Sequence, residues 1–373
     1  MTELTTETPT PALVRNASLL DNVSRMRALD PGGMLSLVGD FPRQCRESID
    51  NASALPGFTS VRPIRAVVVA GMGGSAFAGD ILRCIADRDG IVPVILHRDY
   101  SLPAWVDDHC LVIAVSYSGN TEEVISAFQE ARKRGTQLIC ICSGGSLASL
   151  AETEDAFMIP VSSGLPPRAA TAHLFFPMLR FLTSLGLLKR EFVTDLEETI
   201  AVLRALEPLY GPESPLAVNP AKQLASALDG RIPTVYGTTP WAGVAACRWK
   251  TQFNENAKLH LFSCPFPEQN HNEILAWERS ESQSERWTVV YLRDSEECEE
   301  DARIQRRIEV TKMIIGDAPE QFEITAHGSS VLAKLFSLIF LGDFVSVYLA
   351  FLHGTDPMKI AGIDQLKSAL SEI

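Results

Sequence analysis

The sequence CLVIAVSYSGNTE (residues 110–122) carries an apolar run directly into a cluster of small polar residues. The run Leu111–Val115 is rich in β-branched side chains, which is typical of a strand buried on both faces of a parallel sheet. A helix that starts among hydroxyl groups binds anions, because its first N–H groups have no partners within the helix. A capped turn without a ligand explains the same residues equally well. The polar cluster comprises the hydroxyls of Ser116 and Ser118, the turn residue Gly119, and Asn120 or Thr121 as a helix cap.

A second segment of the same design lies upstream, in RAVVVAGMGGSAFAGD (residues 65–80). An apolar strand leads into Gly71, Gly73 and Gly74, and Ser75 then opens a helix of small residues. The spacing lacks the third glycine of a dinucleotide fingerprint, and no G-K-S or G-K-T of a P-loop is present. Two such turns at one edge of one sheet predict a site for a single small phosphate group rather than a nucleotide.

Length and charge restrict the class of protein. At 373 residues the chain exceeds the usual size of a single core, so we expect two domains. A net charge of −13 argues against nucleic acid or an anionic membrane as partner. The longest apolar stretch, 331–352, is interrupted by Lys334, Gly342 and Asp343, so we expect no membrane span. The N-terminus lacks the features of a signal peptide, and we expect a loosely packed leader in a cytoplasmic protein.

Cysteine and histidine spacing predicts no metal site. The eight cysteines contain no C-x-x-C pair, and the seven histidines show no H-x-x-x-H or H-E-x-x-H spacing. Cys140 and Cys142 share one face of a predicted strand, but no second pair of ligands accompanies them. We therefore expect free thiols, mostly buried, and no metal or cofactor.

From Arg65 onward, strand-like runs alternate with helical patterns, and the rhythm returns after residue 230. This alternation predicts an α/β fold with mainly parallel sheets, right-handed crossovers and ligands at the carboxyl ends of the strands. The layout of the second half suggests a divergent copy of the first. The predicted strands are 66–70, 92–97, 111–116, 136–142, 156–160, 232–237, 260–264 and 287–292. The predicted helices include 75–87, 120–134, 169–185, 241–258, 301–315 and 331–352.

This pattern predicts four consecutive segments. Residues 1–60 form a leader with helices, 61–190 the first α/β subdomain, 191–222 a linker, and 223–373 the second subdomain with C-terminal helices. The interval 278–303, which contains the acidic run from Asp294 to Asp301, is predicted to be peripheral.

Four charged residues are candidates for chemistry. Glu255 lies among amides, and such a carboxylate can remove a proton from carbon if burial tunes its pKa. His271 lies in a polar loop, and a histidine side chain can move protons near neutral pH. Arg168 follows two prolines in a stiff turn, which suits a guanidinium facing an oxyanion. Lys367 falls on a short amphipathic helix. An ordinary exposed side chain also explains each of the four, so the residues alone leave both interpretations open.

Six motifs occur in order along the chain: GMGGSAFAGD (71–80), SYSGNTEE (116–123), PPRAA (166–170), NENAK (254–258), NHNE (270–273) and DPMKIAGIDQLK (356–367). Together they resemble the bifunctional phosphoglucose/phosphomannose isomerase family of the sugar isomerase (SIS) superfamily. Sugar-phosphate-binding regulators and amidotransferase isomerase domains share the serine-rich turn alone, and the full combination is much narrower. The resemblance runs from about residue 65 to the C-terminus.

The resemblance implies two tandem flavodoxin-like SIS subdomains and a metal-independent isomerase without a cofactor. Such an enzyme interconverts fructose 6-phosphate with glucose 6-phosphate, mannose 6-phosphate or both, through an enediol(ate). It implies that Glu255 moves a proton between C1 and C2, and that His271, supplied by the partner in a homodimer, assists ring opening. It implies further that Arg168 stabilises the enediolate and that Lys367 acts near the ring oxygen. The implied phosphate-binding residues are Gly74, Ser75, Ser116, Ser118 and Thr121.

Two other classes of protein remain as alternatives. A non-catalytic SIS-type regulator would bind a sugar phosphate without converting it, and Glu255 distinguishes it from an enzyme. An amidotransferase-type isomerase is disfavoured because Thr2 follows the first methionine where that class has a nucleophilic cysteine. The sequence does not indicate which epimer, glucose or mannose, is preferred.

Overall fold

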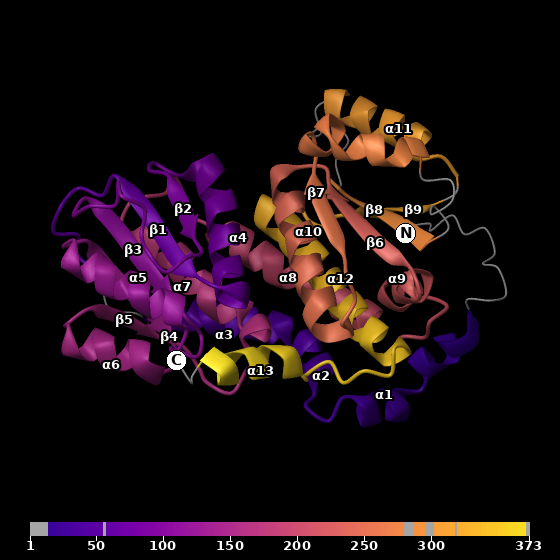
Figure 1. Ribbon diagram of the computed structural model, residues 1–373, viewed down its shortest axis with the longest axis horizontal. Helices are drawn as coiled ribbons and strands as arrows, with labels where there is room; N and C mark the ends of the chain where they lie inside the picture. Colours follow the sequence, from indigo (N-terminus) through magenta and orange to yellow (C-terminus); the bar gives the residue numbers. More distant parts are fainter. Residues whose placement is uncertain (1–13, 55–56, 280–285, 295–301, 318, 371–373) are drawn as a thin grey trace. The chain divides into compact units, whose positions relative to one another are not determined.

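The computed structural model describes residues 14–54, 57–279, 286–294, 302–317 and 319–370 (Figure 1). The chain divides into two compact units, and each is described by itself. The sheet-1 unit comprises residues 40–200, and the sheet-2 unit comprises residues 1–39 and 201–373. The predicted leader in residues 1–13 and the acidic stretch 295–301 lie outside the described residues.

The sheet-1 unit contains five parallel strands in the order β2-β1-β3-β4-β5. This flavodoxin-like order confirms the α/β class predicted from the alternation of strands and helices. Strands β1, β3 and β4 are buried along their whole length, as a strand covered by helices on both faces must be. The strands are β1 (Ala66–Gly71), β2 (Val94–His97), β3 (Cys110–Val115), β4 (Gln137–Cys142) and β5 (Phe157–Pro160).

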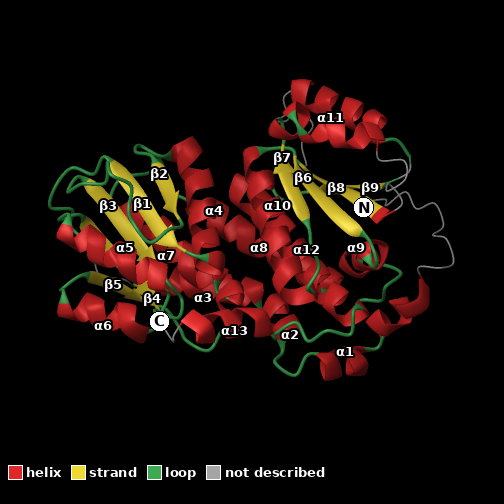
Figure 2. Ribbon diagram, in the orientation of Figure 1, coloured by secondary structure: helices red, strands yellow, loops and turns green. Residues whose placement is uncertain are grey.

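Helices cover both faces of this sheet (Figure 2). On one face, α5 and α6 pack against alternate residues of the central strands, including Val68 and Val112. Helix α7 packs against both α3 and α4, and α4 also contacts β1 and β2. The helices are α3 (Phe41–Ser53), α4 (Gly73–Asp89), α5 (Glu122–Lys133), α6 (Gly145–Thr153), η2 (Pro167–Ala169) and α7 (Thr171–Ser184), followed by α8 (Val193–Tyr210).

The sheet-2 unit repeats the strand order in a shorter form, β7-β6-β8-β9, again parallel. The sequence did not predict β9 (Glu320–Thr325, EQFEIT), because this edge strand is half-exposed and lacks an apolar run. The interval 278–303 was predicted to be peripheral, and this was wrong for its central part. Strand β8 (Trp287–Arg293) lies inside sheet 2 and pairs with β6 on one side and β9 on the other. The remaining strands are β6 (Ile232–Gly237) and β7 (Phe262–Pro265).

The helices of this unit include one that is buried throughout. Among the described residues, α12 (Val331–Leu352) is the helix long and apolar enough to cross a membrane, yet its apolar window lies entirely inside the protein. Three positions that break its apolar pattern meet partners in the core: Lys334 with Asp294 (2.7 Å), Asp343 with Arg248 (2.9 Å), and Gly342 with Trp249. The other helices are η1 (Val14–Asp21), α1 (Val23–Leu29), α2 (Met34–Gly39), α9 (Pro220–Leu228), α10 (Pro240–Gln252), η4 (Glu268–His271), η5 (Glu273–Arg279), α11 (Ala302–Ile315) and α13 (Ala361–Leu370).

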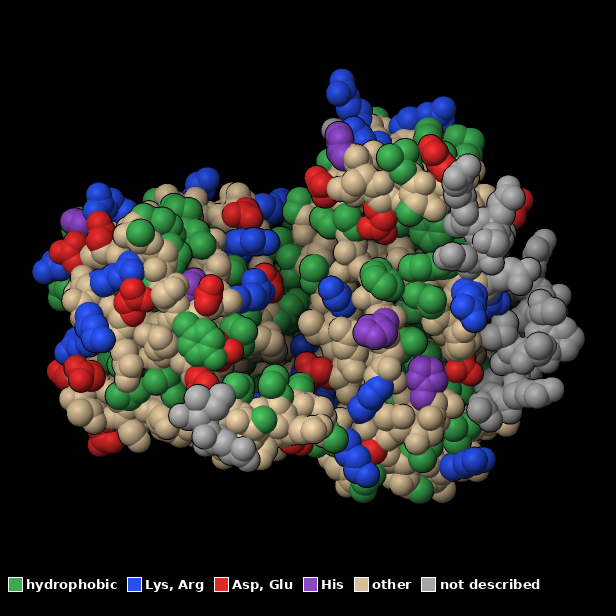
Figure 3. Space-filling model, viewed as in Figure 1, with side chains coloured by type: hydrophobic (Ala, Val, Ile, Leu, Met, Phe, Trp, Pro, Cys, Tyr) green, Lys and Arg blue, Asp and Glu red, His purple; other side chains and the backbone are tan. Residues whose placement is uncertain are grey.

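Charged side chains are mixed over the surface. Figure 3 shows acidic and basic groups interspersed on the face that it displays, without a continuous basic area. An anionic ligand must therefore be held on this face by local geometry rather than by a broad positive field.

Candidate functional site

The two serine-rich turns meet at the carboxyl edge of sheet 1. They follow β1 and β3, which are neighbours in the sheet. The strand after β1 in the chain, β2, lies on one side of this pair, and the strand after β3, β4, lies on the other side. Open α/β sheets bind ligands at such a switch point, outside the carboxyl ends of the strands. The Ser75 hydroxyl accepts a hydrogen bond from the Tyr117 backbone N–H at 3.1 Å, which joins the two turns directly.

Hydroxyl groups are arranged around the second turn. Ser116 Oγ lies 2.8 Å from Thr121 Oγ1 and accepts the Gly119 N–H at 3.1 Å. Ser118 is exposed, and its Oγ accepts the Asn120 N–H at 3.3 Å. We call Gly74, Ser75, Ser116, Ser118 and Thr121 the socket.

The helices that begin at the socket are not closed by side-chain caps. Of the two predicted caps, Asn120 and Thr121, it is Thr121 that occupies the N-cap position of α5, but its hydroxyl lies beside Ser116 and makes no capping bond. Helix α4, which begins after Met72, also has no side-chain cap. The first N–H groups of both helices are thus left without a side-chain acceptor, which favours an anion.

The corresponding turn of sheet 2 is closed. After β6, the Thr239 hydroxyl accepts the Ala242 N–H at 3.2 Å and caps α10. Pro240 begins that helix and has no N–H to offer. The helix that follows β1 therefore starts without a side-chain cap, whereas the helix that follows β6 is capped.

Arg168 lies next to the socket within the same unit. It is 2% exposed and belongs to the short helix η2. A Cβ atom added to Gly74 would lie 2.9 Å from the Pro167 carbonyl oxygen and 3.1 Å from the Arg168 Cα. The segment carrying Arg168 therefore packs directly on the start of α4, and this close approach requires glycine at position 74.

Glu255 lies on a turn that is not α-helical. The sequence predicted one helix from 241 to 258, but α10 ends at Gln252 and continues as a π-turn, Phe253–Ala257. Such π segments are rare and occur frequently at functional sites. The π-turn ends at Ala257, because Lys258 adopts a left-handed φ of +55°.

The neighbours of Glu255 anchor this turn. Asn256 is buried and donates to the Ser346 hydroxyl at 2.9 Å. The Lys258 ammonium donates to the carbonyl oxygens of Glu255 (2.9 Å), Asn256 (3.2 Å) and Asp356 (2.9 Å). Sequence analysis gave Lys258 no role, since its partner Asp356 is 98 residues away and no local pattern marks it.

His271 lies at the end of η4 and is exposed. Flanking residues hold this segment: Asn270 donates to Thr311 Oγ1 at 2.8 Å, and Tyr236 donates its hydroxyl to Glu273 at 2.8 Å. Burial and the nearby Glu273 raise the pKa of Tyr236, which keeps its hydroxyl protonated and donating. No local pattern marks Tyr236, because it occupies an ordinary position in a predicted strand.

The predicted site residues belong to both units. The socket and Arg168 lie in the sheet-1 unit, where the structure brings them together. Glu255, His271 and Lys367 lie in the sheet-2 unit on three separate elements, the π-turn, η4 and the exposed helix α13.

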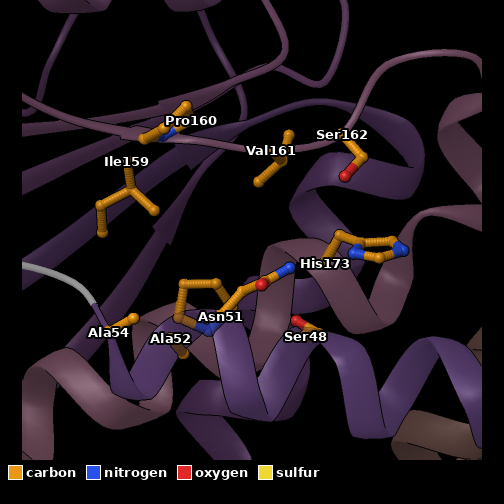
Figure 4. A pocket seen from close by; sticks show the side chains of 10 residues that line it. Ser48, Asn51, Ala52, Ala54, Ile159, Pro160, Val161, Ser162 and His173 are labelled. Carbon is orange, nitrogen blue, oxygen red and sulfur yellow. The ribbon is translucent and has the colours of Figure 1, made fainter.

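A hollow of about 280 Å³ lies in the sheet-1 unit, lined by α3, α7 and the end of β5 with the residues after it (Figure 4). Its lining includes Ser48 and Asn51 of α3, Ser162 after β5, and His173 of α7. Its lining contains no socket residue, although Tyr117 donates its hydroxyl to the Ser162 carbonyl oxygen at 2.8 Å. Burial lowers the pKa of His173, so its imidazole is held neutral.

The described residues contain no group of three or more His, Cys, Asp or Glu arranged to hold a metal ion. The cysteines in this part of the chain are free, and five of the seven are buried. Burial raises the pKa of Cys84 to about 11 and of Cys140 to about 12. These thiols remain protonated near neutral pH and are poor nucleophiles.

Two family models match the chain. The SIS domain matches residues 61–165, and the bacterial phospho-glucose isomerase C-terminal SIS domain matches residues 217–370. The first match contains the socket, and the second contains Glu255, His271 and Lys367.

Curated relatives cover nearly the whole chain. A bifunctional phosphoglucose/phosphomannose isomerase of Caldicellulosiruptor bescii is 41% identical over 91% of this chain and 99% of its own. One of Thermoplasma volcanium is 38% identical over 82% of this chain and 91% of its own.

Solved structures show the same fold at lower identity. A hypothetical protein of Thermus thermophilus superposes with a TM-score of 0.73 at 16% identity, covering 97% of this chain and 96% of the other. A putative phosphosugar isomerase of Clostridium difficile superposes with a TM-score of 0.68 at 14% identity, covering 88% and 95%.

Proposed function

Because the chain belongs to the bifunctional phosphoglucose/phosphomannose isomerase family, we propose that it interconverts fructose 6-phosphate with glucose 6-phosphate, mannose 6-phosphate or both, without a metal ion. The chain is a sugar-phosphate isomerase, and the substrate pair and the chemical route are the parts proposed here. The observation that carries the proposal is the socket, whose hydroxyls surround two helix starts without side-chain caps.

The socket holds the 6-phosphate in this proposal. Ser75, Ser116, Ser118 and Thr121 supply hydroxyls, and the N–H groups at the starts of α4 and α5, next to Gly74, supply further donors. A grip on the phosphate, far from the reacting carbons, fixes the position of C1 and C2 and so lowers the barrier through orientation.

Glu255 moves the proton. The open-chain aldose loses its C2 proton to the carboxylate, the electrons of that bond form the C1–C2 double bond, and the carbonyl oxygen becomes an oxyanion. The same carboxyl group then returns the proton to C1, while the O2 proton passes to the O1 oxyanion, so that O1 becomes a hydroxyl group and O2 the ketone oxygen. One base serves both transfers because the two carbons are adjacent.

Three further groups assist in this proposal. His271, supplied by the partner subunit of a homodimer, helps to open the sugar ring, and Lys367 acts near the ring oxygen. Arg168 stabilises the enediolate. Loss of one such oxyanion partner typically costs on the order of 100- to 1,000-fold in rate.

The test is incubation of chelator-treated protein with fructose 6-phosphate in deuterium oxide, with both aldoses quantified. We expect turnover without added metal and deuterium at C2 of the aldose product. The Glu255→Gln variant should bind substrate but lose turnover, while Glu207→Gln, a change at an exposed carboxylate of α8, should not. Binding without turnover by the unmodified protein would instead identify a regulator.

A further inference from the structure

A histidine from the core helix holds the carboxyl end of the turn that carries Glu255. His353 caps α12, and its Nδ1 lies 3.0 Å from the Ala257 carbonyl oxygen, at the last residue of the π-turn. Its Nε2 lies 3.4 Å from Asp229 Oδ1, which follows α9. The side chains of His353 and Asp229 are 23% and 25% exposed, so both are largely shielded from water.

The two elements that present this pair are fixed. Residues 332–352 of α12 are buried, and α9 packs against α12. Asn256 is bonded to Ser346, which is two turns before His353 on α12. The turn is therefore attached to α12 through two consecutive residues, Asn256 and Ala257, which directly follow Glu255.

The imidazole can make both contacts only when it is protonated. A neutral ring has one N–H, so it can donate to Ala257 or to Asp229 but not to both. In either tautomer of the neutral ring, the nitrogen without a hydrogen directs its lone pair at the oxygen of Ala257 or of Asp229, and that contact is no longer a hydrogen bond. The hydrogen bond to Asp229 is the main cause that raises the pKa of His353, and the contact with Ala257 adds to it.

The groups that face His353 come from two packed elements. Asp229 faces it from the end of α9, and the Ala257 carbonyl faces it from the π-turn. Lys258 follows Ala257, and its ammonium is directed at three carbonyl oxygens, including that of Asp356 after α12.

We propose that His353, paired with Asp229, is a positioning residue that holds the Glu255 turn in its reactive geometry and releases one of its contacts when the ring loses its proton. This inference rests on the proposed role of Glu255. It predicts an activity that falls as pH rises through the pKa of His353, because the single N–H of the neutral ring then serves the charged Asp229 carboxylate and the Ala257 carbonyl loses its donor.

Two substitutions separate the contacts. In His353→Asn the amide nitrogen lies near the place of Nδ1 and can still donate to Ala257, whereas in His353→Gln it lies near the place of Nε2 and can still reach Asp229. We expect His353→Gln to lower kcat by about 10-fold or more with KM changed less than 2-fold, since a small displacement of a reacting group is costly. His353→Asn should retain more of kcat.

Asp229→Asn provides the second measurement. It keeps the ring but removes the negative partner, so the pKa of His353 should fall, and the decline of kcat at high pH should move to lower pH. His109→Asn is the matched control: that ring also lies beside a carbonyl, of Pro63 at 3.3 Å, and a carboxylate, of Asp108 at 4.0 Å, within the sheet-1 unit. It should leave kcat and its pH profile unchanged.

The outcomes distinguish the two levels of inference. Unchanged kcat and pH profile in the three variants at positions 353 and 229, with Glu255→Gln inactive, would overturn the positioning role and leave the proposed function standing. Turnover by Glu255→Gln would overturn the proposed function itself. Thermal melting of each variant shows whether a loss of kcat reflects unfolding, and the shifted pH profile of Asp229→Asn is a change that lost stability alone does not produce.

Discussion

At the scale of single residues, the hydroxyl groups of the socket differ in their burial and in their bonds within the protein. Ser75 and Ser116 are buried and bonded within the protein, whereas Ser118 is exposed. In the proposed site Ser75 and Ser116 therefore serve both the fold and the phosphate, whereas Ser118 can be changed with little effect on the fold. Sequence alone marked all three as equivalent donors, because burial depends on the neighbouring turn.

Ser118→Ala should weaken substrate binding by about 10-fold while leaving the melting temperature close to that of the unmodified protein. A hydrogen bond to a charged group contributes about 1.5–3 kcal/mol, and a tenfold change corresponds to about 1.4 kcal/mol. Isothermal titration with fructose 6-phosphate measures the change in Kd. Ser149→Ala, at an exposed position in α6, serves as the control. Equal affinities of the two variants would contradict the placement of the phosphate.

At the scale of elements, α10 and α12 are joined by polar contacts inside an apolar interface. Arg248 of α10 binds Asp343 of α12 through two bonds of 3.1 and 2.9 Å, and the two side chains are 2% and 9% exposed. Trp249 donates its indole N–H to the Leu338 carbonyl at 2.8 Å and lies against Gly342, where a Cβ atom would be 2.1 Å from the indole nitrogen. These contacts fix how α12 meets the helix that leads to Glu255.

Asp343→Ala should lower the free energy of unfolding by about 3–5 kcal/mol, because it leaves the Arg248 guanidinium buried without its carboxylate. Urea denaturation followed by circular dichroism measures the change. The matched change is Glu309→Ala, which breaks an ion pair with Arg306 whose side chains are 69% and 61% exposed, and which should alter stability little. A similar small effect in both variants would show that the buried pair does not stabilise the unit.

At the scale of the whole molecule, the residues with proposed roles are distributed over both units and, for His271, over two chains. The socket and Arg168 belong to one unit, Glu255 and Lys367 to the other, and His271 is proposed to come from a partner subunit. The proposed supply of His271 by a partner subunit predicts that activity depends on dimerisation.

Mixing two inactive variants tests the contribution of the partner. In a heterodimer of Glu255→Gln with His271→Asn, one of the two sites combines an intact Glu255 with an intact His271 from the other chain. Random exchange of subunits gives half heterodimers, so we expect up to about a quarter of the unmodified activity to return. If His271 acts within its own chain, every site in the mixture carries one substitution and no activity returns. Activity is measured before and after mixing, and each variant alone is the control.

The sequence by itself determined the fold class, most of the strands and the order of the motifs. Apolar runs such as Leu111–Val115 must be buried, and turn residues such as Gly119 allow few backbone conformations, so both can be recognised locally. It failed at β9, because an edge strand needs no apolar run, and at the π-turn, because the left-handed Lys258 is not signalled by its residue type.

Tertiary structure alone decided which turn is open to a ligand and what holds the proposed base. Thr121 and Thr239 both stand at helix starts, yet only Thr239 caps its helix, since Thr121 finds Ser116 instead. The anchors of the Glu255 turn come from Ser346 and His353, about 90 residues further along the chain. Contacts between residues so far apart in sequence arise only when the core forms, and no local pattern can encode them.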